Sequence, residues 1–251
     1  AANNFAGETF KLTKDINFNG ERWTPIGLNA DSPNKFSGIF DGQGHKIVNL
    51  VVDTEDGYTA AGLFGALNGT AKNFTIENAF IKHISTGDAT DNGIAVVAGS
   101  IYNKGTIENV TVLNAVVEGN RYVGGIAGYV YGNIKNCVVD GIEITVTPNK
   151  IANGYDNGDK AGAIAGYFSD ESVYYVSGNI AKNFTVQAYR DLGGIVGCAN
   201  KGAYVKDNVA ENGTLIVNQT NYYGEKDANA GYIVGRIVNG FVGTGNTANN
   251  V

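Results

Sequence analysis

A short phrase of small and aliphatic residues ending in glycine occurs six times along the chain. It reads AGLFG at 61–65, VVAG at 96–99, GGIAG at 124–128, AGAIAG at 161–166, GGIVG at 193–197 and AGYIVG at 230–235. We call the final residues of these phrases the marker glycines: Gly65, Gly99, Gly128, Gly166, Gly197 and Gly235. They are separated by 34, 29, 38, 31 and 38 residues. A period in this range indicates a solenoid or a propeller, in which each repeat packs against its neighbours.

The residues around each marker glycine alternate as they do in a β-strand. Two positions before the glycine every copy is aliphatic: Leu63, Val97, Ile126, Ile164, Ile195 and Ile233. Two positions after it every copy is apolar: Leu67, Ile101, Val130, Phe168, Ala199 and Ile237. Because successive side chains of a strand point to opposite faces, these residues and the glycine share the inward face. We expect a larger residue at the glycine to overfill a narrow core, and Ile126, Ile164 and Ile195 to form one column.

A second segment in each copy begins with asparagine. It reads KNFTIENA at 72–79, ENVTVLNA at 108–115, KNCVVDG at 135–141, KNFTVQA at 182–188 and DNVAENG at 207–213. The shared residues are Asn73, Asn109, Asn136, Asn183 and Asn208. Equivalent residues in stacked coils lie about 4.8 Å apart, so turn asparagines can hydrogen-bond to their copies above and below. We predict that these five form a structural ladder, with an inward apolar residue after each one.

A third apolar segment closes most copies, as in IEITV at 142–146. Three short strands per period predict one coil of an all-β parallel β-helix, since a propeller blade needs about 40–45 residues and four antiparallel strands. We expect about seven coils and right-handed winding, the usual hand of parallel crossovers. One domain covers 1–251, with a first coil and cap at 1–50 and six repeats at 51–251. The last repeat is incomplete, so further polypeptide is expected in the parent protein.

Composition excludes several other classes. The chain has 36 glycines and 32 asparagines among 251 residues, and both residue types disfavour helices. With 43% hydrophobic and 17% charged residues it is unlike a disordered chain. No run reaches the ~18 apolar residues of a membrane-spanning helix, so this segment is not expected to insert into a membrane. The net charge of −6 argues against a nucleic-acid partner.

The amino-terminal part adds the phrases FKLTKDINFNG at 10–20, WTPIG at 23–27 and FSGIFDGQGHKIVNL at 36–50. Together with GGIAG and KNFTI, they make nearly the whole chain resemble the GLUG-motif repeat proteins of bacterial cell surfaces. The resemblance implies a parallel β-helix on an exported or surface-anchored, adhesin-like protein. Some bacterial immunoglobulin-cleaving metallopeptidases have similar repeats outside their catalytic domain. This chain has no HExxH motif, and the resemblance brings no catalytic residues with it.

The sequence offers little for catalysis. The outward neighbours of the marker glycines contain no acidic pair: Ala66, Ser100, Tyr129, Tyr167, Cys198 and Arg236. The four arginines fall on different coils. Cys137 occupies an inward position, and Cys198 has no nearby histidine in its repeat to activate it. The aspartate-containing loops lack the spacing of known calcium sites. We therefore expect no enzyme activity, no cofactor and no metal.

Length variation between the copies is concentrated after the third strand, at 85–93, 147–160 and 218–230. Insertions at one phase of a solenoid collect on one edge, which is often the binding edge. The candidate binding residues are Tyr129, Tyr155, Asp156, Tyr167, Tyr222 and Tyr223. Exposed tyrosines can stack on sugar rings or anchor a protein partner. Alternatively, Tyr129 and Tyr167 stack on adjacent coils and merely shield the sheet.

These observations favour a non-catalytic, adhesin-like β-helix protein that is secreted or attached to the bacterial surface. It would bind a host or dietary glycan, or a surface protein, through loops on one edge. Two alternatives remain open: a polysaccharide-active lyase or glycoside hydrolase, and a passive structural stalk. Location outside the cell is an expectation from the resemblance, because this segment contains no export signal.

Overall fold

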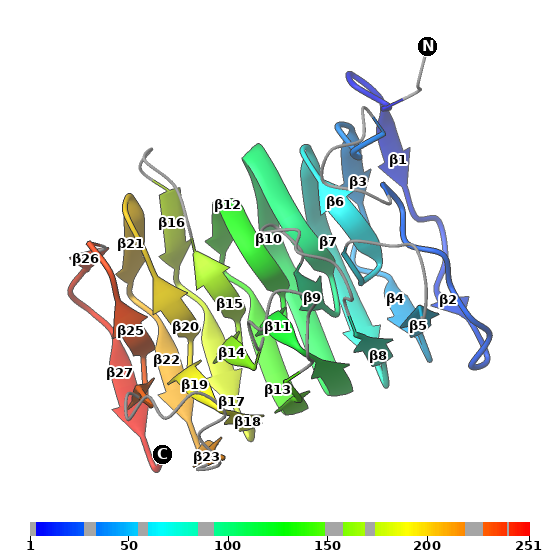
Figure 1. Ribbon diagram of the computed structural model, residues 1–251. Helices are drawn as coiled ribbons and strands as arrows, with labels where there is room; N and C mark the ends of the chain where they lie inside the picture. Colours follow the sequence, from blue (N-terminus) through cyan, green and yellow to red (C-terminus); the bar gives the residue numbers. More distant parts are fainter. Residues whose placement is uncertain are drawn as a thin grey trace, which may run out of the picture.

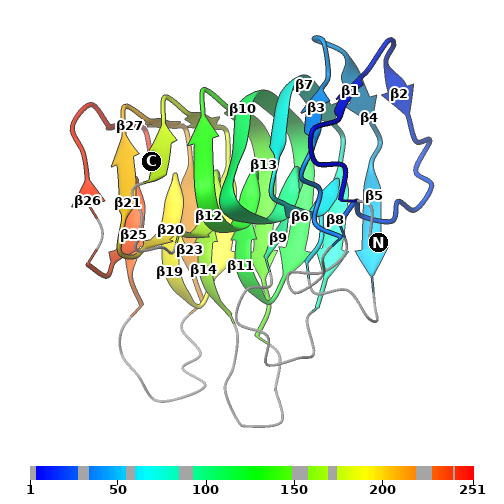
Figure 2. The same ribbon diagram turned by 90° about the horizontal axis from the view of Figure 1, so that it is seen from above.

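The computed structural model describes residues 4–27, 34–54, 60–84, 93–148, 158–168, 174–218, 228–239 and 241–251. All regular elements within these ranges are β-strands, and each strand pairing between them is parallel. Figure 1 shows the strands stacked one after another from the amino-terminal to the carboxy-terminal end, and Figure 2 shows the same stack from above. This parallel stacking is compatible with a β-solenoid. We call one passage of the chain through the stack a layer.

The marker glycines lie on or next to six strands of one large sheet, sheet A. These are β6 (Phe64–Leu67), β10 (Ala98–Gly119), β12 (Ala127–Lys135), β15 (Ala165–Phe168), β20 (Val196–Ala199) and β25 (Val234–Ile237). Their register sets Gly65, Gly99, Gly128, Gly166, Gly197 and Gly235 opposite one another in successive layers. The sequence repeat is therefore the structural repeat.

The other strands of sheet A continue each layer. In the first half of the chain they are β1 (Thr9–Lys11), β2 (Ile16–Asn17), β3 (Ile39–Asp41), β4 (Lys46–Val48), β5 (Val51–Thr54), β7 (Thr70–Glu77) and β8 (Phe80–His83). In the second half they are β13 (Val138–Val146), β16 (Tyr174–Ser177), β17 (Ile180–Lys182), β18 (Thr185–Ala188), β21 (Ala203–Lys206), β22 (Val209–Glu211), β23 (Thr214–Val217), β26 (Phe241–Val242) and β27 (Thr247–Asn249).

A second, smaller sheet B precedes the marker strands. Its members are β9 (Ile94–Ala95), β11 (Arg121–Gly124), β14 (Asp159–Gly162), β19 (Arg190–Gly193) and β24 (Ala230–Gly231). The two layers at 159–188 and 190–217 therefore contain five short strands each, where the sequence predicted three. The difference has two causes. Each glycine phrase turns sharply in its middle, and each asparagine-containing arm bends at a left-handed residue.

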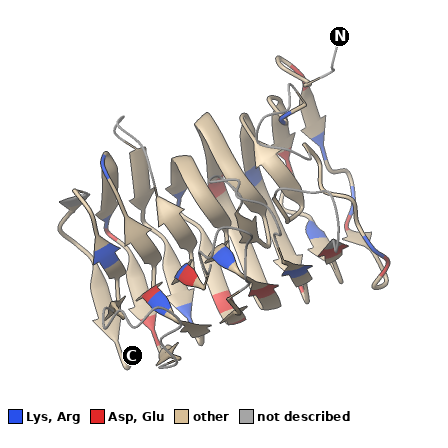
Figure 3. Cartoon of the chain, in the orientation of Figure 1, with Lys and Arg blue, Asp and Glu red and all other residues tan. Residues whose placement is uncertain are grey.

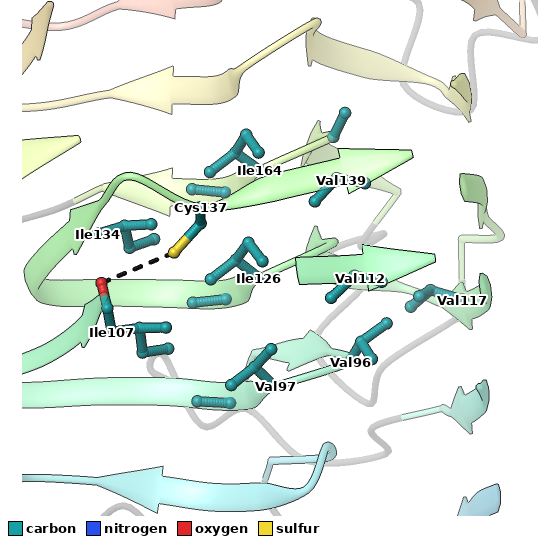
Figure 4. Packing of buried hydrophobic residues seen from close by; sticks show 14 of the residues in the cluster. Val96, Val97, Ile107, Val112, Val117, Ile126, Ile134, Cys137, Val139 and Ile164 are labelled. Atoms are coloured by element: carbon teal, nitrogen blue, oxygen red, sulfur yellow. Dashed lines mark hydrogen bonds between the residues drawn. The ribbon is translucent and has the colours of Figure 1, made fainter. Parts of the chain in front are cut away.

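The interior is one continuous aliphatic core. The predicted column is present, since the amide of Ile126 donates to the carbonyl of Ile164, and that of Ile164 to Ile195, at 2.9 and 3.1 Å. All three side chains are fully buried. Figure 4 shows Ile126 and Ile164 beside Val139 and Val112 in this core. Burying such an aliphatic side chain contributes about 1.5–3 kcal/mol to the stability of the fold. Each layer gains this stabilisation by placing aliphatic side chains against those of the layers next to it, which explains why the pattern repeats.

The marker glycines are required by a close approach of backbones. A Cβ atom on Gly128 would lie 2.2 Å from the Ile94 nitrogen and 2.3 Å from the Tyr122 oxygen, both in sheet B. One on Gly166 would lie 2.5 Å from the Val123 nitrogen. Sheet B therefore packs directly on the glycine-bearing strands, which is the narrow region that the sequence predicted.

Candidate functional site

The tyrosines predicted to bind a partner fall partly within the described structure. Tyr129 on β12 and Tyr167 on β15 point outward from adjacent layers, with ring centroids 5.8 Å apart and planes tilted by 48°. Both side chains are half-buried. Tyr102 on β10 extends the row, 5.9 Å from Tyr129. The other candidates, Tyr155, Asp156, Tyr222 and Tyr223, lie outside the described residues.

Sheet B contributes a tyrosine that the sequence analysis missed. The Tyr122 ring stacks on Tyr167 with centroids 4.9 Å apart and planes 16° from parallel. Tyr122 has φ 48° and is 4% exposed, and burial raises the pKa of its hydroxyl above the ordinary value. The Arg121 guanidinium lies 4.5 Å from the ring centroid and donates to its hydroxyl at 2.7 Å. Tyr122 thus adds a fourth ring to the row of Tyr102, Tyr129 and Tyr167, and the Arg121 cation contacts that fourth ring.

Equivalent positions on β14 and β19 are charged. Residues six before the marker glycine are Tyr122, Lys160, Asp191 and Asn229, and those seven before it include Arg121, Asp159 and Arg190. This fixed offset is the sequence signal that would have revealed them. The register stacks Arg121, Asp159 and Arg190 in one column across β11, β14 and β19. Figure 3 shows basic and acidic segments side by side on these short strands.

Asp159 is held ionised by its neighbours. Arg190 Nη2 donates to Asp159 Oδ2 at 2.9 Å, and Lys160 Nζ pairs with the same oxygen. Burial acts to raise the pKa of Asp159, but the Lys160 ammonium and the Arg190 guanidinium outweigh it and lower the pKa below its usual value. Lys160 also lies over the rings of Tyr122 and Tyr167, at 5.3 and 5.6 Å. The charged column and the tyrosine row therefore form one connected surface.

Asp191 is the most deeply buried acidic group at the edge formed by the first residues of the sheet B strands. It is 0% exposed, and burial raises the pKa of its carboxyl, although Asn229 Nδ2 donates to its Oδ1 at 2.9 Å. Two guanidinium groups approach its other oxygen: Arg236 Nη1 at 3.6 Å and Arg190 Nε at 4.0 Å. The arginines do come from different layers, as the sequence indicates. The parallel register nevertheless brings Arg121, Arg190 and Arg236 to one edge.

The same folding corrects the expectation about acidic residues. The outward positions of the marker strands contain no acidic pair, but Asp159 and Asp191 reach this edge from sheet B. Both cysteines are buried, and burial raises the pKa of the Cys137 and Cys198 thiols to about 12. Neither thiol is therefore activated as a nucleophile. Within the described ranges, no group of three or more histidine, cysteine, aspartate or glutamate side chains is arranged to hold a metal.

The asparagines predicted to form one ladder are distributed over three columns. The first column contains Asn73, Asn109 and Asn136, which lie opposite one another at the same corner of successive layers. Asn109 Nδ2 donates to Asn73 Oδ1 at 3.3 Å, and Asn73 Nδ2 donates to Asp41 Oδ1 at 3.1 Å. In later layers the same column continues with Gly178, Asp207 and Gly245. All six have positive φ, which asparagine, aspartate and glycine tolerate best.

Asn183 belongs to the next corner of the layer instead. Its neighbour Lys182 pairs with Asp140 and Glu211 in the adjacent layers, which places Asn183 opposite Gly141 and Asn212. That corner column is Asn49, Asn78, Asn114, Gly141, Asn183, Asn212 and Asn250, all with positive φ. The letters KNFT occur at both 72–75 and 182–185, but the second copy is displaced by one corner. Phe184 is consequently inward in a different column from Phe74.

Asn208 lies inside the core. It forms a buried amide ladder with Asn179 and Asn246: Asn179 Nδ2 donates to Asn208 Oδ1 at 2.9 Å, and Asn208 Nδ2 donates to Asn246 Oδ1 at 3.1 Å. Asn179 and Asn208 are both 0% exposed. In earlier layers this inward column consists of Phe74, Val110 and Cys137. The column thus changes from apolar side chains to hydrogen-bonded amides between β12 and β17.

The predicted insertions enter the fold next to the charged column. Residues 149–157 lie between β13 and Gly158, directly before Asp159, and residues 85–92 lie directly before Gly93 and β9. Residues 219–227 likewise precede β24 by two residues. The structure does not describe these segments, but their described flanks all border sheet B. Nor does the described part contain a helix long and apolar enough to cross a bilayer.

Comparisons with known proteins agree with this architecture. The family model described as the GLUG motif matches residues 119–147, which include β11, β12 and Gly128. Halomucin from Haloquadratum walsbyi is 36% identical over 131 residues, which cover 48% of this chain and 1% of halomucin. A provisionally named Gly-rich membrane protein from Evansella cellulosilytica is 34% identical over 121 residues, 43% of this chain and 13% of that protein. The chain therefore matches only a small part of each relative's length.

A solved structure extends the similarity to the fold as a whole. The crystal structure of a protein from Bacteroides ovatus, provisionally named an immunoglobulin A1 protease, superposes with a TM-score of 0.58 and 22% identity. The superposition covers 96% of this chain and 67% of that one. At this identity the likeness concerns the fold alone. The motif match over residues 119–147 is direct: this chain carries the GLUG motif.

Proposed function

We propose that this chain is a non-catalytic, adhesin-like module of a secreted or cell-surface protein. Its fold would be a right-handed parallel β-helix of about seven coils. It would bind a glycan or a protein partner through the edge formed by the first residues of the sheet B strands. The names of the two relatives, a halomucin and a membrane protein, support a location at the cell surface. The match to the GLUG motif supports the same location.

The observation that carries the proposal is the coincidence of three features on one edge. The variable segments enter there, the half-buried tyrosines Tyr129 and Tyr167 lie in adjacent layers, and a charged column runs beside them. The rest of each layer is a repeated core that leaves little room for variation. A rigid stack that presents variable segments along one edge is the usual arrangement of a solenoid binding surface.

The buried acidic groups favour binding over hydrolysis. A glycosidase needs two carboxyl groups that reach the two sides of a sugar ring. Asp191 has the raised pKa of a general acid, yet it is fully buried beneath Arg236 and Arg190 and cannot contact a glycosidic oxygen. Asp159 is ion-paired with Arg190 and Lys160. These carboxylates position cations.

A glycan array and a reducing-sugar assay on the same polysaccharides test the proposal. We expect specific binding without release of new reducing ends. The triple substitution of Tyr155, Tyr222 and Tyr223 by alanine should weaken binding, whereas the matched control Tyr204→Ala, on β21, should leave it unchanged. Turnover of any polysaccharide would show that the chain is an enzyme. Unchanged binding by the parent protein carrying the triple substitution would favour a passive stalk.

A further inference from the structure

Three of the four arginines of the chain gather on the edge where sheet B begins. Arg121, Arg190 and Arg236 lie there together with Lys160, and we call these four side chains the basic corner. The two carboxylates among them, Asp159 and Asp191, leave a net charge of about +2 on this group of described residues, in a chain whose net charge is −6. The charge of this group of side chains is thus opposite in sign to that of the chain as a whole.

The charges of the basic corner are arranged by depth. The side chains of Asp159 and Asp191 are 11% and 0% exposed, whereas those of Arg190 and Arg236 are 37% and 43% exposed. The carboxylates therefore hold the guanidinium groups from beneath, and the cations form the outer layer. A guanidinium has five N–H donors in a rigid plane, which suits it to pair with a second carboxylate from outside.

Arg190 and Arg236 come from successive layers and converge on one atom. Arg190 Nε lies 4.0 Å and Arg236 Nη1 lies 3.6 Å from Asp191 Oδ2. The strand register thus brings the two guanidinium groups to the same carboxylate. Fixing donors before binding lowers the entropy cost of engaging an external anion. Charge-assisted pairs of arginine with carboxylate are also among the stronger polar contacts.

Aromatic rings adjoin this pair of arginines. Tyr167 is connected to the basic corner through Lys160, which lies 5.6 Å from its ring centroid, and Tyr129 lies in the layer before it. The Tyr167 hydroxyl also accepts a hydrogen bond from Asn200 Nδ2 at 2.9 Å, which fixes the ring. Half-buried rings that cannot rotate freely offer an apolar surface at low entropy cost. Cationic groups and half-buried rings thus lie next to each other.

We propose that the basic corner binds an acidic saccharide of the uronic-acid class. Arg190 and Arg236 pair with the sugar carboxylate, while Tyr129 and Tyr167 pack against the apolar face of a neighbouring sugar ring. This inference rests on the proposed function and names the class of ligand for the same edge. An acidic peptide would satisfy the arginines but would offer no stack of rings to the tyrosines, which is why the saccharide is favoured.

Hexagalacturonate is a suitable probe, with its fully methyl-esterified form as a control that removes the charges and adds only one methyl group to each carboxyl. In titration calorimetry on the full chain, the acid should bind at least about tenfold more tightly than the ester, and more weakly at about 0.5 M than at 0.05 M salt. Arg236→Gln should weaken binding of the acid by about tenfold. The matched control is Arg22→Gln, because Arg22 lies in the first layers, 70% exposed and paired with Asp53. Circular dichroism checks that both variants keep the β-rich fold.

Equal affinity for acid and ester, or an unchanged affinity in Arg236→Gln, would overturn the inference. Tighter binding of a polyglutamate peptide than of hexagalacturonate would also overturn it, and would assign the edge to acidic proteins. If hexagalacturonate fails to bind while the glycan array detects a neutral ligand, the uronate inference fails and the proposed function stands. If neither binds, and no protein partner is found, both fail together.

Discussion

Replacing Asn208 with leucine should destabilise the protein strongly, although the two side chains have the same branching and the same number of heavy atoms. The side chain of Asn208 makes four hydrogen bonds in the core. Its Oδ1 accepts from the nitrogen and the Nδ2 of Asn179, at 3.0 and 2.9 Å, and its Nδ2 donates to Val176 O at 2.8 Å and Asn246 Oδ1 at 3.1 Å. Leucine satisfies none of these partners, and water cannot reach them because Asn179 and Asn208 are 0% exposed.

The expected loss follows from the number of groups left without a partner. Each such bond contributes about 0.5–1.5 kcal/mol net, so losing four gives a loss of about 2–6 kcal/mol in the free energy of unfolding. This is a large share of the roughly 5–15 kcal/mol that stabilises an average domain. Leucine leaves no cavity, and because its methyl groups are larger than the amide atoms, packing strain adds to the loss of the hydrogen bonds.

Urea denaturation followed by circular dichroism measures this loss. The matched control is Asn109→Gly, which retains a residue suited to φ 54° and removes one exposed bond of 3.3 Å to Asn73. That control should cost no more than about 1 kcal/mol. In a double-mutant cycle, Asn179→Leu and Asn208→Leu together should cost less than the sum of the two single changes. A loss below about 0.5 kcal/mol for Asn208→Leu would refute the argument.

Three further outcomes are expected. Gly166→Val should prevent or severely weaken folding, since even its Cβ would lie 2.5 Å from the Val123 nitrogen; a soluble variant with wild-type melting temperature would contradict this. Burial raises the folded-state pKa of Asp191, so its contribution to stability is present below about pH 4 and is lost as the pH rises through the raised value. The Asp191→Asn variant should therefore melt no lower than the wild type at pH 7. Its melting temperature, measured by calorimetry, should also depend less on pH between pH 4 and 7. The thiols of Cys137 and Cys198 should react with a disulfide reagent only after denaturation, and rapid reaction in the native state would disprove their burial.

Much of the fold could be predicted because a solenoid repeats its constraints. The spacing of the marker glycines, and the aliphatic residues two positions on either side, indicated inward-facing strands, and the register confirms that equivalent residues stack. Four of the five shared asparagines, Asn73, Asn109, Asn136 and Asn183, have the positive φ of a turn, whereas Asn208 lies in the core. The predicted number of strands per layer was wrong, because the pattern of apolar residues along the sequence does not distinguish a continuous strand from one that is divided by a sharp corner.

The candidate site was predicted less well than the fold. Tyr129 and Tyr167 were identified because they adjoin the marker glycine in sequence. Tyr122 and Asp191 were missed, because their backbone turns to the left-handed conformation and redirects their side chains onto the outer edge. Strand alternation, which assumes extended geometry, gives the wrong direction for a residue at such a turn.

The amino-acid sequence by itself determined the period, the aliphatic column around Ile164 and the corners, since these are local requirements repeated in every layer. Only the tertiary structure decided which asparagine belongs to which column and which charges meet. Segments of unequal length separate the copies, so equal letters such as those before Asn183 and Asn73 do not occupy equal positions. Parallel hydrogen bonding between layers selects the register that buries the apolar column. That register, and no sequence spacing, brings Arg190 and Arg236 to the same carboxylate of Asp191.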